Sequence, residues 1–162
     1  MAWSAPRTWV AANVLTAAQL TTDVRDNMLW LGTRKGFKIR RVAVQSITTA
    51  TTTAVSFDTE DSDTDAFGAV PSTTYTVPTG LDGLYAITAN VVFAAAAGTT
   101  PFMRVIAGGV SHDFAITTAV SDGSGSIIVP LVATNTIALS VFQNSGGNVN
   151  VTATLWANFV GR

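Results

Sequence analysis

Cysteine is absent from the 162-residue chain, and histidine occurs only once. A chain without cysteine forms no disulfides and no thiolate metal sites, which excludes a disulfide-stabilised scaffold and sulfur redox chemistry but leaves the compartment open. A secretory signal peptide is not expected either, because Trp3, Ser4 and Pro6 interrupt any apolar run near the N-terminus.

Charged side chains are also scarce. They make up 12% of the residues, against about 25% in an average soluble domain, and residues 123–161 contain none. Asn, Thr, Gln, Pro and Gly interrupt that stretch every few residues, so it does not form the ~20-residue apolar helix that spans a membrane. We therefore expect no membrane association. We expect instead that other copies of the chain cover part of its surface, as in an obligate homo-oligomer.

The few charges are unevenly distributed. Residues 1–41 hold seven basic and two acidic side chains, whereas the rest of the chain holds two basic and eight acidic ones. The segment RKGFKIRR concentrates the basic charge in Arg34, Lys35, Lys38, Arg40 and Arg41. Its simplest interpretation is a solvated hinge over residues 34–41, and the alternative is a contact with an acidic surface of a partner. Nucleic acid is the least favoured partner, because the rest of the chain is acidic and no aromatic platform lies among the basic residues.

Residues 1–33 are predicted to form an extended arm followed by one helix. Thr16 and Gln19 fit a capping box, in which each side chain accepts a hydrogen bond from the backbone N–H of the other residue. Gly32 would end the helix. Spacings of four, four and three residues then place one apolar stripe along it, made of Leu20, Val24, Met28 and Leu31. Because an isolated helix of ~16 residues is marginal in water, the stripe must pack on the chain's own domain or in a short helix bundle.

From residue 42 onward, apolar residues alternate with more polar ones. The odd-numbered residues of 85–93, 137–141 and 149–159 form three apolar faces, which is the pattern of half-buried β-strands. Turns rich in Gly, Asn and Asp separate these runs, and the Thr-rich residues 48–53 are interpreted as strand and bend. The sequence therefore predicts a mainly β, antiparallel β-sandwich over residues 42–162.

No catalytic constellation emerges from the sequence. Ser111 and Asp113 flank His112, the single histidine, and on a strand they point to the opposite face from it, so no local triad forms. Three copies of His112 on a threefold axis could bind a metal, but a surface or interface histidine is the favoured interpretation. A glycoside hydrolase would need an acid and a base held apart in a cleft, and nothing here fixes that geometry. We expect no enzymatic activity and no cofactor.

One acidic segment, DTEDSDTDAFG, is a candidate calcium site. Asp61, Asp63 and Asp65 alternate as carboxylates do at the start of an EF-hand loop. An EF-hand is excluded, because the glycine falls at Gly68 and the twelfth position is Ser72 instead of Glu. A solvated acidic loop is therefore preferred over calcium binding.

The first 31 residues, MAWSAPRTWVAANVLTAAQLTTDVRDNMLWL, resemble the start of many tailed-bacteriophage virion proteins, in which a Trp-x-x-Pro-x-Thr-Trp phrase precedes a helix of the pattern vTaaqlN…vRDNl. The chain departs from the pattern at residues 21–22, where the family often has Asn, and at residues 11–12, where it often has Gly-Glu. The resemblance implies a segment that attaches to a neighbouring virion protein. Its anchors would be Trp3, Pro6, Trp9, Leu20, Val24 and Met28.

The remainder resembles the trimeric jelly roll of the tumour necrosis factor and complement globular-head superfamily. The segments VSFDTEDSDTDAFG, YTVPTGLDGLYAITANVVFA and TATLWANFVGR follow the order of strands in that fold. This resemblance implies a jelly-roll sandwich and a homotrimer, whose threefold axis would cover the uncharged residues 123–161.

Together the resemblances imply a non-enzymatic phage virion protein, assembled in the host cytoplasm and attached to other virion proteins through residues 1–41. The first candidate role is a tail-fibre or tail-tip adhesin that binds a glycan or protein of the host surface, and the alternative is a capsid decoration or head-fibre protein. The candidate ligand loops, chosen as polar turns between strands, are residues 98–101, 108–112 and 144–148.

Overall fold

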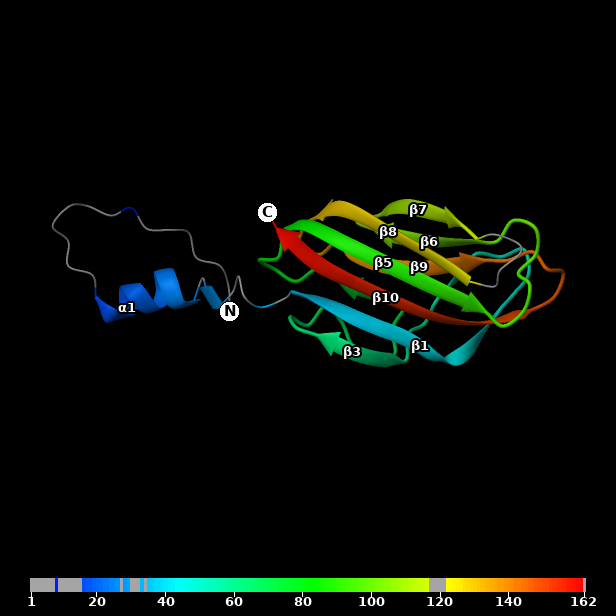
Figure 1. The fold of residues 1–162 in the computed structure, drawn as a ribbon, viewed down its shortest axis with the longest axis horizontal. Helices are drawn as coiled ribbons and strands as arrows, with labels where there is room; N and C mark the ends of the chain where they lie inside the picture. Colours follow the sequence, from blue (N-terminus) through cyan, green and yellow to red (C-terminus); the bar gives the residue numbers. More distant parts are fainter. Residues whose placement is uncertain are drawn as a thin grey trace. The chain divides into compact units, whose positions relative to one another are not determined.

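The chain divides into two compact units, residues 1–34 and residues 35–162. The computed structural model describes Thr8, residues 16–26, 28–29, Thr33, 35–116 and 122–161. The first unit contains the helical segment, and the second contains all the strands of the described chain (Figure 1).

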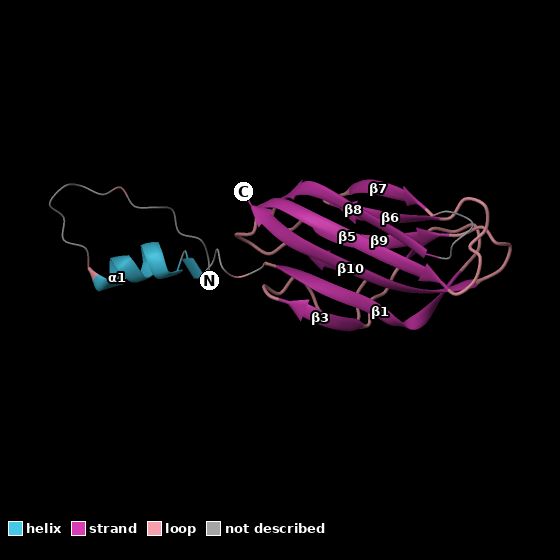
Figure 2. Ribbon diagram, viewed as in Figure 1, coloured by secondary structure: helices cyan, strands magenta, loops and turns pink. Residues whose placement is uncertain are grey.

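Residues 35–162 form a β-sandwich of two antiparallel sheets (Figure 2). The strands are β1 (Gly36–Ile47), β2 (Thr53–Ala54), β3 (Thr59–Asp63), β4 (Thr74–Thr76), β5 (Gly83–Phe93), β6 (Phe102–Ala107), β7 (Val110–Ala115), β8 (Asp122–Leu131), β9 (Thr136–Phe142) and β10 (Val149–Gly161). The first sheet has the order β3-β1-β10-β5-β8 and the second β2-β9-β6-β7, with β4 also paired to β9. The predicted mainly β, antiparallel jelly-roll sandwich is confirmed.

The core consists of the predicted strand faces. The odd-numbered residues of β5 from Tyr85 to Phe93 are fully buried, and the odd-numbered residues of β10 from Val149 to Ala157 are buried as well. At one end of the core the aromatic rings cluster: the ring centroid of Phe37 lies 4.9 Å from that of Tyr75 and 5.2 Å from that of Phe67. Burying one such side chain contributes roughly 1.5–3 kcal/mol, so this cluster is a major source of stability.

The helical segment begins where the capping box predicts. The Thr16 hydroxyl accepts from the Gln19 backbone N–H at 3.2 Å, and the Gln19 side chain accepts from the Thr16 N–H at 2.8 Å. One α-helical turn, α1 (Ala17–Leu20), continues into a wider π-helical stretch, η1 (Thr21–Asp26). No residue of α1 or η1 is buried, and Leu20, Val24 and Met28 are exposed, so in the described residues of this unit the apolar stripe is uncovered. Leu31 and Gly32 lie outside the described residues.

Among the described residues, no helix is long and apolar enough to cross a membrane.

The expected hinge over residues 34–41 is wrong from Gly36 onward. These residues open β1, the domain begins at Lys35 instead of residue 42, and Arg34 lies outside the described residues. The physical reason is that Phe37 and Ile39 alternate with the basic side chains and are fully buried in the core. The acidic segment is likewise not a loop at its start, because Thr59–Asp63 forms β3 and pairs with β1.

The two ends of the sandwich hold different loops. We call the end at which the chain enters through Lys35 the proximal end. There β1 begins and β10 ends, and the turns at residues 108–109 and 132–135 lie at the same end. At the opposite, distal end, Ile47 pairs with Val149 and the connections 48–52, 94–101 and 143–148 gather (Figure 1).

Candidate functional site

The basic residues predicted to contact a partner are paired with acidic residues inside the domain. Lys35 Nζ lies 3.1 Å from Asp65 Oδ1, and Arg41 Nη1 lies 3.4 Å from Asp58 Oδ2. Asp61 receives two cations, Lys38 Nζ at 3.2 Å and Arg40 Nη2 at 2.7 Å. The hydrogen bond from Arg40 holds the pKa of the Asp61 carboxyl below its ordinary value. The basic run of β1 therefore joins β1 to β3 and the turn that follows, and the contact with an acidic partner stays a prediction.

The three carboxylates of the calcium candidate do not converge. Asp61 is taken by Lys38 and Arg40, and Asp65 accepts from Lys35 and from the Thr64 hydroxyl at 2.9 Å. Asp63 accepts backbone N–H groups of the following turn, those of Phe67 and Gly68 at 3.1 Å. Within residues 35–116 and 122–161 and the described helical segment, no three His, Cys, Asp or Glu side chains are grouped so that they could hold a metal ion.

β1 carries a bulge near its middle. Arg41 pairs with Ala153 and Gln45 with Val151, so three residues of β1, numbers 42–44, lie opposite one residue of β10. The Asp58 carboxylate accepts the N–H groups of Val42 and Ala43, both at 2.9 Å, which replaces the missing sheet hydrogen bonds. The N–H of Val42 is the largest cause of the lowered pKa of Asp58. A side chain outside the sheet thus holds the bulge in shape.

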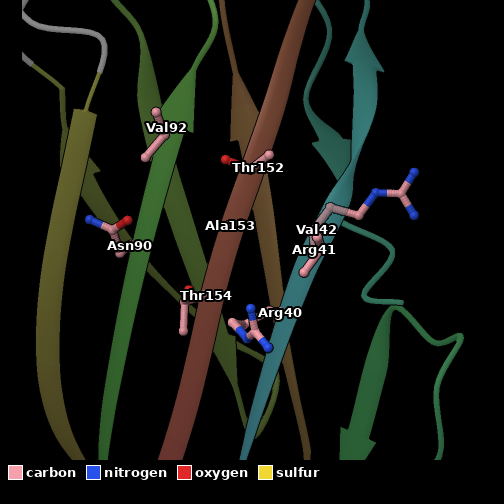
Figure 3. Close-up of a pocket in the computed structure, with 8 residues that line it drawn as sticks. All are labelled: Arg40, Arg41, Val42, Asn90, Val92, Thr152, Ala153 and Thr154. Carbon is pink, nitrogen blue, oxygen red and sulfur yellow. The ribbon is translucent and has the colours of Figure 1, made fainter. Parts of the chain in front are cut away.

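The bulge opens a hollow of about 280 Å³ on the outer face of the first sheet (Figure 3). It is lined by Arg40, Arg41, Val42, Asn90, Val92, Thr152, Ala153 and Thr154. The Arg41 guanidinium points away from it, toward the Ser56 carbonyl, to which Nη1 donates at 3.2 Å. The only titratable groups of this lining are two arginines, so the hollow supplies hydrogen-bonding groups but no acid–base pair.

His112 lies on β7 of the second sheet. It is half-buried, whereas its neighbours Ser111 and Asp113 are exposed, which confirms the predicted alternation. The His112 Nε2 atom is buried without a hydrogen-bond partner. Nothing in the described chain brings a nucleophile or an acid to it, and the expectation that the protein is not an enzyme stays a prediction.

The outer face of the first sheet exposes apolar side chains. Leu84, Val92, Ile128 and Val160 are 41%, 36%, 67% and 59% exposed. Leu84 lies opposite Pro130, and Ala86 lies between Ile128 and Asn158. One of the two edge strands of this sheet, β8, has no charge after Asp122. Natural edge strands usually carry charges that prevent pairing with other chains, so this face and edge are the surface that most needs a cover.

Two of the three predicted ligand loops meet at the distal end. The Asn144 amide donates to the Thr99 hydroxyl at 3.0 Å and to the Thr100 hydroxyl at 3.1 Å, and it accepts the Thr100 N–H at 3.2 Å. Gly98 has a φ of 97°, and a β-carbon there would collide with Asn144. The third loop, residues 108–112, lies at the proximal end instead.

A further loop, residues 48–52, joins the distal pair. The Thr49 hydroxyl accepts the Gly146 N–H at 3.1 Å, and the fully buried Gln143 amide donates to the carbonyls of Ile47 at 2.9 Å and Gly147 at 2.7 Å. The sequence signalled only strand and bend there. Together the distal loops form a surface of small, uncharged side chains, mostly Thr, Ala, Asn and Gly, held by hydrogen bonds between loops.

Comparison with known proteins supports the fold. No protein-family model matches the chain, and no curated protein matches its sequence. Solved structures are similar to it: the globular domain of zebrafish complement 1qA protein has a TM-score of 0.61 at 16% identity, over 79% of this chain and 98% of that chain. The PRD1 vertex protein P5 has a TM-score of 0.60 at 16% identity, over 78% of this chain and 96% of that chain. Murine APRIL has a TM-score of 0.52 at 12% identity, over 75% and 98%. The predicted likeness to the tumour necrosis factor and complement globular-head fold is therefore confirmed at the level of fold.

Proposed function

We propose that the chain is a homotrimeric virion protein of a tailed bacteriophage, attached to the particle by residues 1–33 and binding the host surface with its distal loops. The observation that carries this proposal is the difference between the two ends of the sandwich. The chain enters the sandwich at the proximal end. The uncharged loops 48–52, 94–101 and 143–148, which hydrogen bonds join to one another, lie at the distal end. A domain attached through one end presents the opposite end to the surroundings.

Self-association is supported by the first sheet. Its outer face exposes Leu84, Val92 and Ile128, and one of its edge strands, β8, has no charge after Asp122 that would keep the edge free. A trimer that buries this face would also explain why β10, and β8 after Asp122, carry no charge. The similarity to a complement globular domain is a likeness of fold alone, and the trimer rests on these surfaces.

Attachment is supported by the helical segment. Leu20, Val24 and Met28 are exposed on it, and an apolar stripe of this kind needs a partner surface. Of the proposed anchors, Trp3, Pro6 and Trp9 lie outside the described residues, so their role rests on the resemblance to phage virion proteins.

The alternative role is capsid decoration or a head fibre. It is favoured by the similar fold of a vertex protein, PRD1 P5. A decoration protein would bind particles through residues 1–33 and would have no use for a ligand at the distal loops.

The two roles separate in a binding experiment with fluorescently labelled protein. The protein is mixed with host cells and, separately, with phage particles that lack it. For an adhesin we expect binding to both cells and particles. A variant that lacks residues 1–15 should still bind cells but should no longer bind particles. Binding to particles alone would favour decoration, and binding to neither would refute both roles.

A matched pair of substitutions tests which end binds cells. Gly147 at the distal end and Gly161 at the proximal end both have open space where a side chain would start, and neither has a positive φ. Gly147→Arg should weaken cell binding at least tenfold, while Gly161→Arg should leave it unchanged. Equal effects would refute the orientation.

A further inference from the structure

The outer face of the second sheet carries three consecutive pairs of side chains near the distal end. Phe102 of β6 lies opposite Phe142 of β9. Two residues further along β6, Arg104 lies opposite Asp113 of β7. Thr100 lies two residues before Phe102, and Asn144 lies two residues after Phe142. Hydrogen bonds join Thr100 to Asn144. An aromatic pair thus lies between an ion pair and a hydroxyl–amide pair.

The aromatic pair is stacked and half-exposed. The ring centroids of Phe102 and Phe142 are 5.1 Å apart with an angle of 11° between the planes. The Cζ atom of Arg104 lies 5.2 Å from the centroid of Phe102, so the guanidinium covers part of that ring. Neither phenylalanine points into the core, where an apolar side chain on a strand is most stabilising.

The ion pair has a fixed geometry. Arg104 Nε donates to Asp113 Oδ1 at 2.6 Å and Nη2 to Oδ2 at 2.7 Å, a bidentate arrangement. The side chains are 31% and 49% exposed. An exposed pair contributes little to stability, yet between residues 66 and 161 the only other charges are Asp82 and Asp122. Two of the four charges in this part of the chain therefore lie beside its exposed aromatic pair.

The composition of this surface indicates the chemistry of its ligand. The paired guanidinium and carboxylate have no net charge, so they do not select an anion or a cation. They present donors and acceptors side by side. Beside the phenyl rings, the two Asn144 amide hydrogens are taken by Thr99 and Thr100, so there the Thr100 hydroxyl supplies the donor and Asn144 Oδ1 the acceptor. A hydroxyl group both donates and accepts, and a sugar ring adds an apolar face of C–H groups that packs on an aromatic ring. A neutral carbohydrate therefore matches both the apolar phenyl rings and the hydrogen-bonding groups on either side of them.

We infer that Phe102, Phe142, Arg104 and Asp113, with Asn144 at the distal edge, bind a neutral carbohydrate chain. The sugar rings contact the exposed parts of the two phenyl rings, and hydroxyls bind Arg104 and Asp113 on one side and Asn144 on the other. The inference rests on the proposed adhesin role and names its ligand. The outer face of the first sheet, which the trimer would cover, takes no part in it.

The test uses the full-length protein and immobilised polysaccharides. The probes are neutral chains (dextran, mannan, galactan and β-glucan), acidic chains (alginate and hyaluronan) and the envelope polysaccharide extracted from the host. We expect binding to the host polysaccharide and to at least one neutral chain, with little effect of salt. Binding to no polysaccharide, or only to acidic chains with steep salt dependence, would overturn the inference.

Substitutions locate the site. Phe102→Leu keeps an apolar side chain of similar volume but removes the ring, and Arg104→Lys keeps the charge but removes the bidentate geometry. Each should lower the affinity at least tenfold with an unchanged melting temperature. Val110→Ala, an exposed residue on the turn at the proximal end, is the matched control and should bind as wild type. Wild-type affinity in both Phe102→Leu and Phe142→Leu would overturn the inference.

The same variants keep this inference separate from the adhesin role. If Phe102→Leu protein still binds cells with wild-type affinity, the adhesin role stands but its binding site lies elsewhere on the domain and its receptor is, for example, a protein. Wild-type protein that binds neither cells nor polysaccharides would contradict both proposals.

Discussion

Replacing Gln143 by leucine should destabilise the domain strongly, because this amide is a buried connection between three backbone segments. Its side chain is fully buried, its Nε2 donates to the carbonyls of Ile47 and Gly147, and its Oε1 accepts from the N–H and hydroxyl of Ser145, both at 2.8 Å. Leucine has a similar volume but satisfies none of these groups. A buried polar group left without a partner costs about 1–3 kcal/mol. The buried Ile47 carbonyl would be left without this donor, whereas the Gly147 carbonyl still accepts from the Ser145 hydroxyl at 3.1 Å, so we expect a loss of about 1–3 kcal/mol.

The chain provides a matched control in Gln45. Its amide also bridges backbone groups, donating to the Ala54 carbonyl at 2.7 Å and accepting from the Ser56 N–H at 2.9 Å, but it is half-exposed. Water can replace the lost partners there, so Gln45→Leu should cost at most about 1 kcal/mol. Urea unfolding of both variants, compared with wild type at equal protein concentration because of self-association, measures the difference. A Gln143→Leu variant no less stable than Gln45→Leu would refute the reasoning.

The other predictions concern the core, the bulge and the acidic segment. Leu155→Asp puts an unpaired charge on a fully buried face and should cost at least about 4 kcal/mol, enough to prevent folding; a soluble, cooperatively melting variant would contradict this. Tyr75→Phe should raise the unfolding free energy by up to about 1 kcal/mol, since the buried Tyr75 hydroxyl has no hydrogen-bond partner; a loss in chemical denaturation would reveal an unseen partner. Asp58→Asn should cost about 1 kcal/mol at pH 7. The pKa of Asp58 is lowered by folding, so its contribution is full above the unfolded pKa of about 3.9 and is lost as the pH falls through the folded pKa. The difference in unfolding free energy between Asp58→Asn and wild type should therefore become smaller in acid. A difference that does not change with pH would refute the role of the charge. A calcium chelator should leave the melting midpoint unchanged if residues 58–65 are held only by β1, whereas a lower midpoint would show a bound ion.

The sequence predicted the strands whose apolar residues alternate without interruption, and these are β5, β9 and β10. It missed β1, although Phe37 and Ile39 alternate there too, because the basic side chains between them are typical of a solvated segment. What makes those charges compatible with a strand is the acidic strand β3 beside it, and that neighbour follows from the topology of the sheet, which the sequence alone does not supply.

The distal loops show the same limit. Polar turns could be recognised from Gly, Asn and Thr. The end of the sandwich at which each turn lies, however, depends on how many strands separate the turns. Residues 98–101 and 144–148 are connections at the same end, and residues 108–112 follow one strand later at the opposite end. The outer aromatic pair was also invisible, because Phe102 and Phe142 are 40 positions apart and meet only through the pairing of β6 with β9.

The opposite charges of β1 and β3 also bear on the order in which the chain folds during synthesis. β3 follows β1 by about a dozen residues, whereas the other neighbour of β1, the central strand β10, begins about a hundred residues after β1 ends. The ribosome therefore releases β1 with one partner long before the other. Pairing of Lys38 and Arg40 with Asp61 supplies a local, charge-directed contact for that interval, and contacts between nearby residues form fastest. The edge that β10 later fills stays open until the last strand of the sandwich emerges, so association between subunits has to wait until the whole sandwich has been synthesised.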